Sequence, residues 1–166
     1  MSVAGSRTTD PLPDTARASW RDAPVGRLQL ASLVGIIVIA VVVGFWAYAL
    51  PLEFYDHFPS VLGEWVSQDG PYNGHLVRDH GAQYLALGAG SVAALFWRSQ
   101  PLFRVLGIAW GTFGVLHGAY HVTHLGHMST SDQVGLVTLL TIAAVLGIGI
   151  AVPPRRRASS RATGGR

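Results

Sequence analysis

The sequence predicts an all-α integral membrane protein, a four-helix bundle with both termini in the cytoplasm. Of its 166 residues, 49% are hydrophobic and 13% are charged, and the apolar residues gather in four long runs. Runs of this length and composition are typical of membrane spans. Eleven of the twelve basic residues, all arginines, lie in the two tails or between residues 98 and 104. Because cytoplasmic segments carry an excess of basic residues, this distribution indicates that both tails are cytoplasmic.

Residues 28–50 form the first predicted span. This run carries no charge, and at about 1.5 Å per residue it covers a hydrocarbon core of about 30 Å. Ala47 and Ala49 flank Tyr48 in the manner of a signal-peptide cleavage site, so a cleaved signal is the alternative. We expect the segment to be retained because signal peptides usually have an apolar run of only about 7 to 15 residues. Residues 1–27 are polar and lack apolar periodicity, which predicts a disordered cytoplasmic tail.

An acidic, proline-containing outer loop over residues 51–76 separates the first span from the other three. We expect a short amphipathic helix at about 61–66 within it. The later spans are predicted at about 77–97, 102–126 and 133–152. Pro101 suits the first turn of the third span, and Ser129, Thr130 or Ser131 can cap the fourth. Pro153 and Pro154 end the membrane domain, and residues 153–166 form a basic cytoplasmic tail.

The stretch HGAYHVTH near the end of the third span contains the most distinctive pattern. His117, His121 and His124 fall within about 60° of one another on a helix and form one stripe. Imidazoles facing lipid are costly, so we expect this stripe to face the bundle or a water-filled cavity. Glycines at positions 107, 111, 114 and 118 form a neighbouring stripe, and Gly81 and Gly88 play a similar part in the second span. Small residues at this spacing predict close helix contacts beside the histidines.

The start of the second span supplies further polar groups at a similar expected depth. His75, Asp79 and Gln83 follow one another at intervals of four residues and therefore share a helix face. Neutral imidazole and carboxylate together suit iron, copper and zinc. The sequence thus predicts a transition-metal site near the outer leaflet, with iron or copper favoured over zinc and haem b as a less favoured alternative. Its predicted ligands are drawn from His75, Asp79, His117, His121 and His124. Because His117 and His124 lie about 10 Å apart along the helix axis, one ion would use His121 with either His117 or His124, plus Asp79 and optionally His75, and a two-ion site would use all five. Gln83 and Tyr120 are predicted to orient a cofactor or substrate.

Several classes of function are excluded by composition. The chain has no cysteine, so disulfides and thiolate metal sites are absent. Its arginines lie beside apolar spans and no nucleic-acid module is visible, so nucleic acid is not an expected partner. Two roles remain for a multi-pass protein of the plasma (inner) membrane. One is a small oxidoreductase that acts on a lipophilic substrate or quinone. The other is a non-enzymatic metal-binding or accessory subunit, partnered by another membrane protein or by further copies of itself.

The segments EFYDHFP, PYNGHLVRDHGAQYLAL and HGAYHVTHLGH resemble uncharacterised small four-span membrane proteins of actinobacterial type. The resemblance covers about residues 53–127 and implies the architecture without an activity. The residue types at the five predicted ligands are also similar to those of copper-binding membrane subunits of particulate methane and ammonia monooxygenases. In those subunits Asp and His on neighbouring helices hold the ion, and the likeness implies a comparable pairing here.

Overall fold

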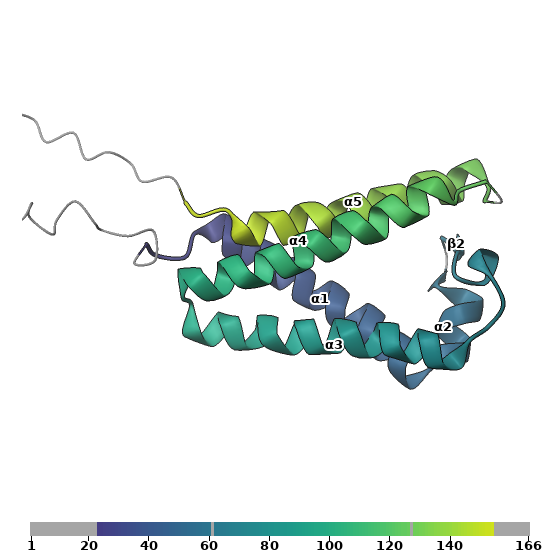
Figure 1. The fold of residues 1–166 in the computed structure, drawn as a ribbon, viewed down its shortest axis with the longest axis horizontal. Helices are drawn as coiled ribbons and strands as arrows, with labels where there is room; N and C mark the ends of the chain where they lie inside the picture. Colours follow the sequence, from purple (N-terminus) through teal and green to yellow (C-terminus); the bar gives the residue numbers. More distant parts are fainter. Residues whose placement is uncertain (1–22, 61, 127, 155–166) are drawn as a thin grey trace, which may run out of the picture.

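The computed structural model describes residues 23–60, 62–126 and 128–154 and is mostly helical (Figure 1). Four long helices, α1 (Arg27–Ala49), α3 (Gly74–Trp97), α4 (Gln100–Thr123) and α5 (Thr130–Ala151), are accompanied by a short helix α2 (Pro51–His57). Between α2 and α3 lie an antiparallel pair of two-residue strands, β1 (Pro59–Ser60) and β2 (Gly63–Glu64), and a 3₁₀ turn η3 (Ser67–Asp69). Most of the two predicted tails lies outside the described residues.

The surface of the helices is typical of a membrane protein. Among the described residues, three helices are long and apolar enough to cross a bilayer, namely α1, α4 and α5. Large apolar side chains point outward along them, including Val38 and Phe45 on α1, Ile108 on α4, and Ile142 and Val145 on α5, all at least 45% exposed. Lipid removes the cost that water would impose on such a surface. Helix α3 is as long as the others, but Arg78 and Asp79 lie in its first two turns.

Each long helix begins or ends where local chemistry dictates, a few residues from some of the predicted boundaries. Helix α3 starts at Gly74, earlier than expected, because the Asn73 Oδ1 accepts hydrogen bonds from the backbone N–H of His75 and Leu76. Ser129 caps α5, its Oγ accepting from the Asp132 N–H, as one of the three predicted candidates. Helix α4 ends at Thr123, not near residue 126, and His124 leaves helical geometry.

The outer loop differs from the prediction. A helix was expected at about 61–66, but residues 63–64 form strand β2 and the helical turn precedes them as α2. Pro51 follows the first predicted span directly. In the structure it is the first residue of α2, where the backbone N–H that proline lacks would have no partner within the helix. Phe58 and Trp65 then join the two sides of the loop, because the Trp65 N–H donates to the Phe58 carbonyl at 2.8 Å.

The long helices pack as two close pairs. Helices α1 and α3 touch backbone to backbone: a Cβ added to Gly81 would lie 2.8 Å from the Gly44 carbonyl oxygen. Helices α4 and α5 do the same, since a Cβ on Gly147 would lie 2.7 Å from the Gly111 nitrogen. The predicted close contacts are therefore confirmed at glycines 81, 88, 107, 111 and 114, whereas Gly118 has no neighbour nearer than 4.0 Å. Between the pairs, α3 and α4 lie close at their shared turn and separate toward the loop end (Figure 1).

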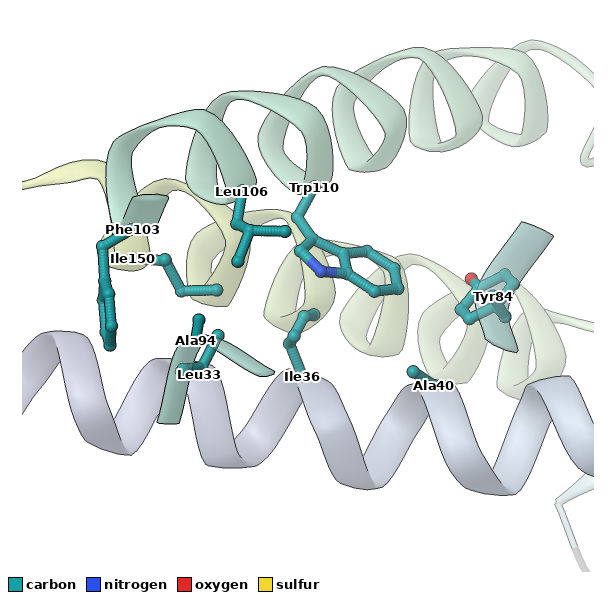
Figure 2. Packing of buried hydrophobic residues seen from close by; sticks show 9 residues of the cluster. All are labelled: Leu33, Ile36, Ala40, Tyr84, Ala94, Phe103, Leu106, Trp110 and Ile150. Carbon is teal, nitrogen blue, oxygen red and sulfur yellow. The ribbon is translucent and has the colours of Figure 1, made fainter. Parts of the chain in front are cut away.

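Between the two pairs, large side chains fill the space nearest the α3–α4 turn. Figure 2 shows Leu106 and Trp110 pointing from α4 toward Ile36 of α1. The Trp110 indole N–H donates to the Ser91 Oγ at 2.9 Å, which links α4 to α3 in the interior. Because lipid is as apolar as these side chains, their close packing and the Trp110–Ser91 hydrogen bond hold the four helices together at this end.

Two buried glutamines hold together the end of the bundle at which the described chain begins and ends. Gln29 and Gln100 exchange two amide hydrogen bonds of 3.1 and 3.0 Å. Gln29 also donates to the carbonyl of Ile150, and Gln100 donates to that of Pro24. The start of α1, the start of α4 and the end of α5 thus share one end, and the outer loop and the α4–α5 connection lie at the other (Figure 1).

Candidate functional site

Three histidines meet between α3 and α4, toward the loop end of the bundle. The ring centroids of His80 and His117 are 5.5 Å apart, and those of His117 and His121 are 4.7 Å apart. All three side chains are half-buried. We call His80, His117 and His121 the imidazole cluster. Two of its members were predicted as ligands, and His80 was not among the predicted site residues.

The packing of α3 against α1 brings His80 into the cluster. Val77, Gly81 and Tyr84 are buried and define the inner face of α3. His80 lies at the edge of that face, where its ring contacts Tyr84 at 5.0 Å as well as His117. Its spacing of four from Tyr84 was the signal in the sequence that could have identified it.

The wall of the cluster is aromatic and apolar. Phe113 stacks on His117 with ring centroids 5.2 Å apart and planes 13° apart, and Tyr84 lies edge-on to Phe113 at 5.3 Å. A cavity of about 10 Å³ lies beside His117, lined by Tyr84, Trp110, Phe113 and apolar residues of α1 and α5. Its size is at the lower limit for a single water molecule.

The predicted residues of α3 lie away from this cluster. His75 and Asp79 contact each other, with Nε2 and Oδ2 3.3 Å apart, and their side chains are 86% and 62% exposed. Gln83 is exposed as well. The structure therefore brings His75 and Asp79 together at the solvent-facing start of α3, whereas His80 provides the contact with α4.

His124 and Tyr120 form a second small group at the end of α4. Their rings stack with centroids 4.2 Å apart, and the His124 Nδ1 lies 2.8 Å from the Tyr120 carbonyl oxygen. Both side chains are exposed. Because His124 is the residue that ends the helix, its ring turns back along α4, where it does not extend the stripe made by His117 and His121.

The outer loop lies at the same end of the bundle as the cluster (Figure 1). Asp69, at the end of η3, is within electrostatic range of His121. Trp65 is only 5% exposed, and its indole Nε1 donates to the Asp132 Oδ1 at 3.0 Å. The loop thus contacts α5 through Trp65 and approaches α4 through Asp69.

The cluster has the donor type for a metal, although its rings are not placed around an ion. Within the described ranges, no group of three His, Cys, Asp or Glu side chains has the arrangement of a metal site. Two imidazoles bound to one ion at about 2.1 Å have ring centroids about 4.5 to 5.3 Å apart. The His117–His121 separation falls inside this range and the His80–His117 separation just beyond it.

Comparisons with known proteins found no relative. No protein-family model matches the chain, no curated protein matches it, and no solved structure matches it.

Proposed function

We propose that this protein is a four-span membrane protein that binds one transition-metal ion between α3 and α4, through the imidazole cluster. The observation that carries the proposal is that the His117 ring lies at centroid distances close to those of a shared ion from both His121, at 4.7 Å, and His80, at 5.5 Å. Neutral imidazole suits copper, iron and zinc, and we favour iron or copper. Small rotations about the imidazole χ angles would bring the three ring nitrogens around one ion.

The proposed topology places the cluster toward the outer face of the plasma (inner) membrane. Helix α3 packs on α1 at two glycines, with Gly81 against Gly44 and Gly88 against Ala40, so its direction is opposite to that of a candidate span. At about 1.5 Å per residue its length suffices to cross the bilayer. Arg27, Arg98 and Arg104 lie near the end that carries the glutamine pair. The positive-inside rule then makes this end, with both chain termini, cytoplasmic.

The ligand set has two versions. The sequence predicts His75, Asp79, His117, His121 and His124, whereas the geometry favours His117 and His121 together with His80. The exposed His75–Asp79 pair supports the second version, because each group already has the other as its partner. Gln83 and Tyr120 stay as predicted orienting residues of a cofactor or substrate.

The test is the metal content and optical spectrum of protein purified in detergent, compared among single histidine-to-alanine variants. We expect about one equivalent of iron or copper, lost in the His117→Ala, His121→Ala and His80→Ala variants. His75→Ala and His124→Ala are the matched controls, and both should retain the metal. Loss of metal in these two and not in His80→Ala would support the five-residue set instead. A Soret band would assign haem b, and protein free of metal would contradict the proposal.

Two roles for the bound metal are each favoured by an observation. The cavity of about 10 Å³ beside His117 favours a non-enzymatic metal-binding or accessory subunit, because it has no room for an organic substrate. The apolar, aromatic lining of that cavity favours an oxidoreductase acting on a lipophilic substrate or quinone, provided that the α3–α4 interface widens. Oxidation of a short-chain quinol by the metal-loaded protein, abolished in His117→Ala, would decide for the enzyme.

A further inference from the structure

The imidazole cluster lies between two points at which the two helix pairs are tied together. At one end, the Gln29–Gln100 pair joins α1 to α4 by hydrogen bonds within the buried interior. Toward the other end, α3 and α4 separate (Figure 1), and the rings of His80, His117 and Phe113 occupy the space between them. The outer loop lies at this same end of the bundle (Figure 1).

That loop contains a segment that is bound to both helix pairs. We call residues Gly63 to Asp69 the strap. At its start, the backbone of Trp65 is bound to Phe58, which follows α2 on the side of the α1–α3 pair. Its indole is bound to Asp132 at the start of α5, on the side of the other pair. The strap therefore crosses from one helix pair to the other.

The Trp65 indole packs against α5 at a position where the helix carries a glycine. Gly135 lies one turn after Asp132, and a Cβ added there would be 2.9 Å from the Trp65 Cζ2. Only glycine leaves room for the ring at this position. The indole is almost fully buried there, so its seat and its hydrogen bond to Asp132 together hold the strap on α5.

The far end of the strap lies within electrostatic range of His121, a half-buried member of the cluster. Asp69 interacts electrostatically with His121, and the Tyr55 hydroxyl, which donates to the Gly70 carbonyl at 2.6 Å, fixes the chain directly after it. The strap thus extends from α5 to within electrostatic range of His121 at the loop end of the bundle. Release of Trp65 would free the part of the strap that bridges to α5 while Tyr55 still holds its end.

We propose that the strap is a gate that controls access of small aqueous solutes, including a hydrated metal ion, to His117 and His80. The contacts of the Trp65 indole with Asp132 and Gly135 keep the gate closed, and we call these contacts the latch. This inference rests on the proposed function in naming the metal ion as the solute that is admitted. The gate itself is a property of the fold and is measurable without any metal.

The experiment measures the rate at which diethyl pyrocarbonate modifies each histidine in metal-depleted protein in detergent, by peptide mass spectrometry. In the Gly135→Ala variant the added methyl group displaces the indole without altering Trp65 or the cluster. We expect modification of His117 and His80 to accelerate about five- to tenfold, since loss of one anchoring contact changes an opening equilibrium by about that factor. His75, which is exposed already, should react at an unchanged rate.

Gly90→Ala is the matched control, because a Cβ there meets only Leu106 Cδ2 at an ordinary 3.5 Å. Trp65→Phe is the second variant, which removes the indole donor and retains an aromatic ring. Unchanged rates at His117 in both latch variants would overturn the gate. An equal acceleration at every histidine, His75 included, would also overturn it, because it would report loss of the fold. Faster Cu²⁺ uptake with unchanged stoichiometry would extend the result to the metal, whereas absence of Cu²⁺ binding would count against the proposed function and leave the gate supported.

Discussion

At the scale of single residues, buried amides hold one end of the bundle. Gln29 and Gln100 are 1% and 2% exposed, and each uses its amide both as donor and as acceptor in the pair. Their remaining N–H groups reach the carbonyls of Ile150 and Pro24. A buried amide that loses its partner retains the full cost of desolvation, so this network is costly to break at any one member.

Replacement of Gln29 by leucine should lower the stability of the protein by about 1 to 3 kcal/mol, because the Gln100 amide and the Ile150 carbonyl each lose a partner. The measurement is the thermal unfolding midpoint in detergent. Gln83→Leu is the matched control, since Gln83 is exposed, and it should leave the midpoint unchanged. Equal midpoints for the two variants would contradict a stabilising role for the amide pair.

The residue scale also shows why the sequence predicted part of the site and missed His80. The inward orientation of His117 and His121 follows from the cost of imidazoles in lipid, and the two rings do contact each other. On α3, however, Asp79 lies about 200° from Gly81 around the helix, so the two cannot both face the bundle. Gly81 packs on α1, which leaves Asp79 exposed and His80 at the interface. The angular position of each residue relative to Gly81 was therefore sufficient to select His80 over Asp79 as the residue that faces α4.

At the scale of elements, glycine spacing predicted the helix contacts correctly. Gly107 and Gly114 of α4 lie against Ala151 and Ala144 of α5, so the backbones approach more closely than larger side chains permit. The outer loop was predicted less well, because its form depends on a contact with a distant part of the chain. Trp65 is hydrogen-bonded to Asp132, and no sequence pattern within residues 51–76 predicts that contact.

The substitution Gly147→Ala should separate α4 and α5. The added Cβ would lie 2.7 Å from the nitrogen of Gly111 and 2.8 Å from the carbonyl carbon of Trp110, and backbone atoms cannot move aside without moving the helix. We expect a loss of about 1 to 3 kcal/mol, as for overpacked cores. Gly118→Ala is the control, because its nearest neighbour would be Leu140 Cβ at 4.0 Å. The thermal unfolding midpoints of the two variants in detergent are the measurement. An unchanged midpoint for Gly147→Ala would show that α4 and α5 can accommodate the added methyl group without loss of stability.

At the scale of the whole molecule, composition and arginine distribution predict a membrane protein, and the apolar outer surface agrees with that class. The number of spans depends on α3, whose first turns are polar and whose later turns are rich in alanine and glycine. By length and hydropathy, α1, α4 and α5 qualify as membrane spans and α3 does not. Its packing against α1 is a tertiary property, which a scan along the sequence does not detect.

Single-cysteine labelling tests the topology, and the natural absence of cysteine removes any background. We expect a membrane-impermeant maleimide to label Leu62→Cys and Gly126→Cys in intact cells, and to label Ser99→Cys only after permeabilisation. All three positions are exposed. If α3 does not span the membrane, Ser99→Cys will be labelled in intact cells and Gly126→Cys will be protected, which is the opposite pattern for these two sites.

The meeting of the first and last helices also bears on chain connectivity. Gly26 lies against Pro154, so that a Cβ on the glycine would be 3.3 Å from the proline Cβ. A short peptide joining these residues would close the helical body into a ring, and the ring could then be opened at the α4–α5 connection to give a circular permutant. In such a chain α5 would be made before α1, although every helix contact would be the same. Correct folding of this permutant would show that the final structure does not depend on the order in which the helices enter the membrane.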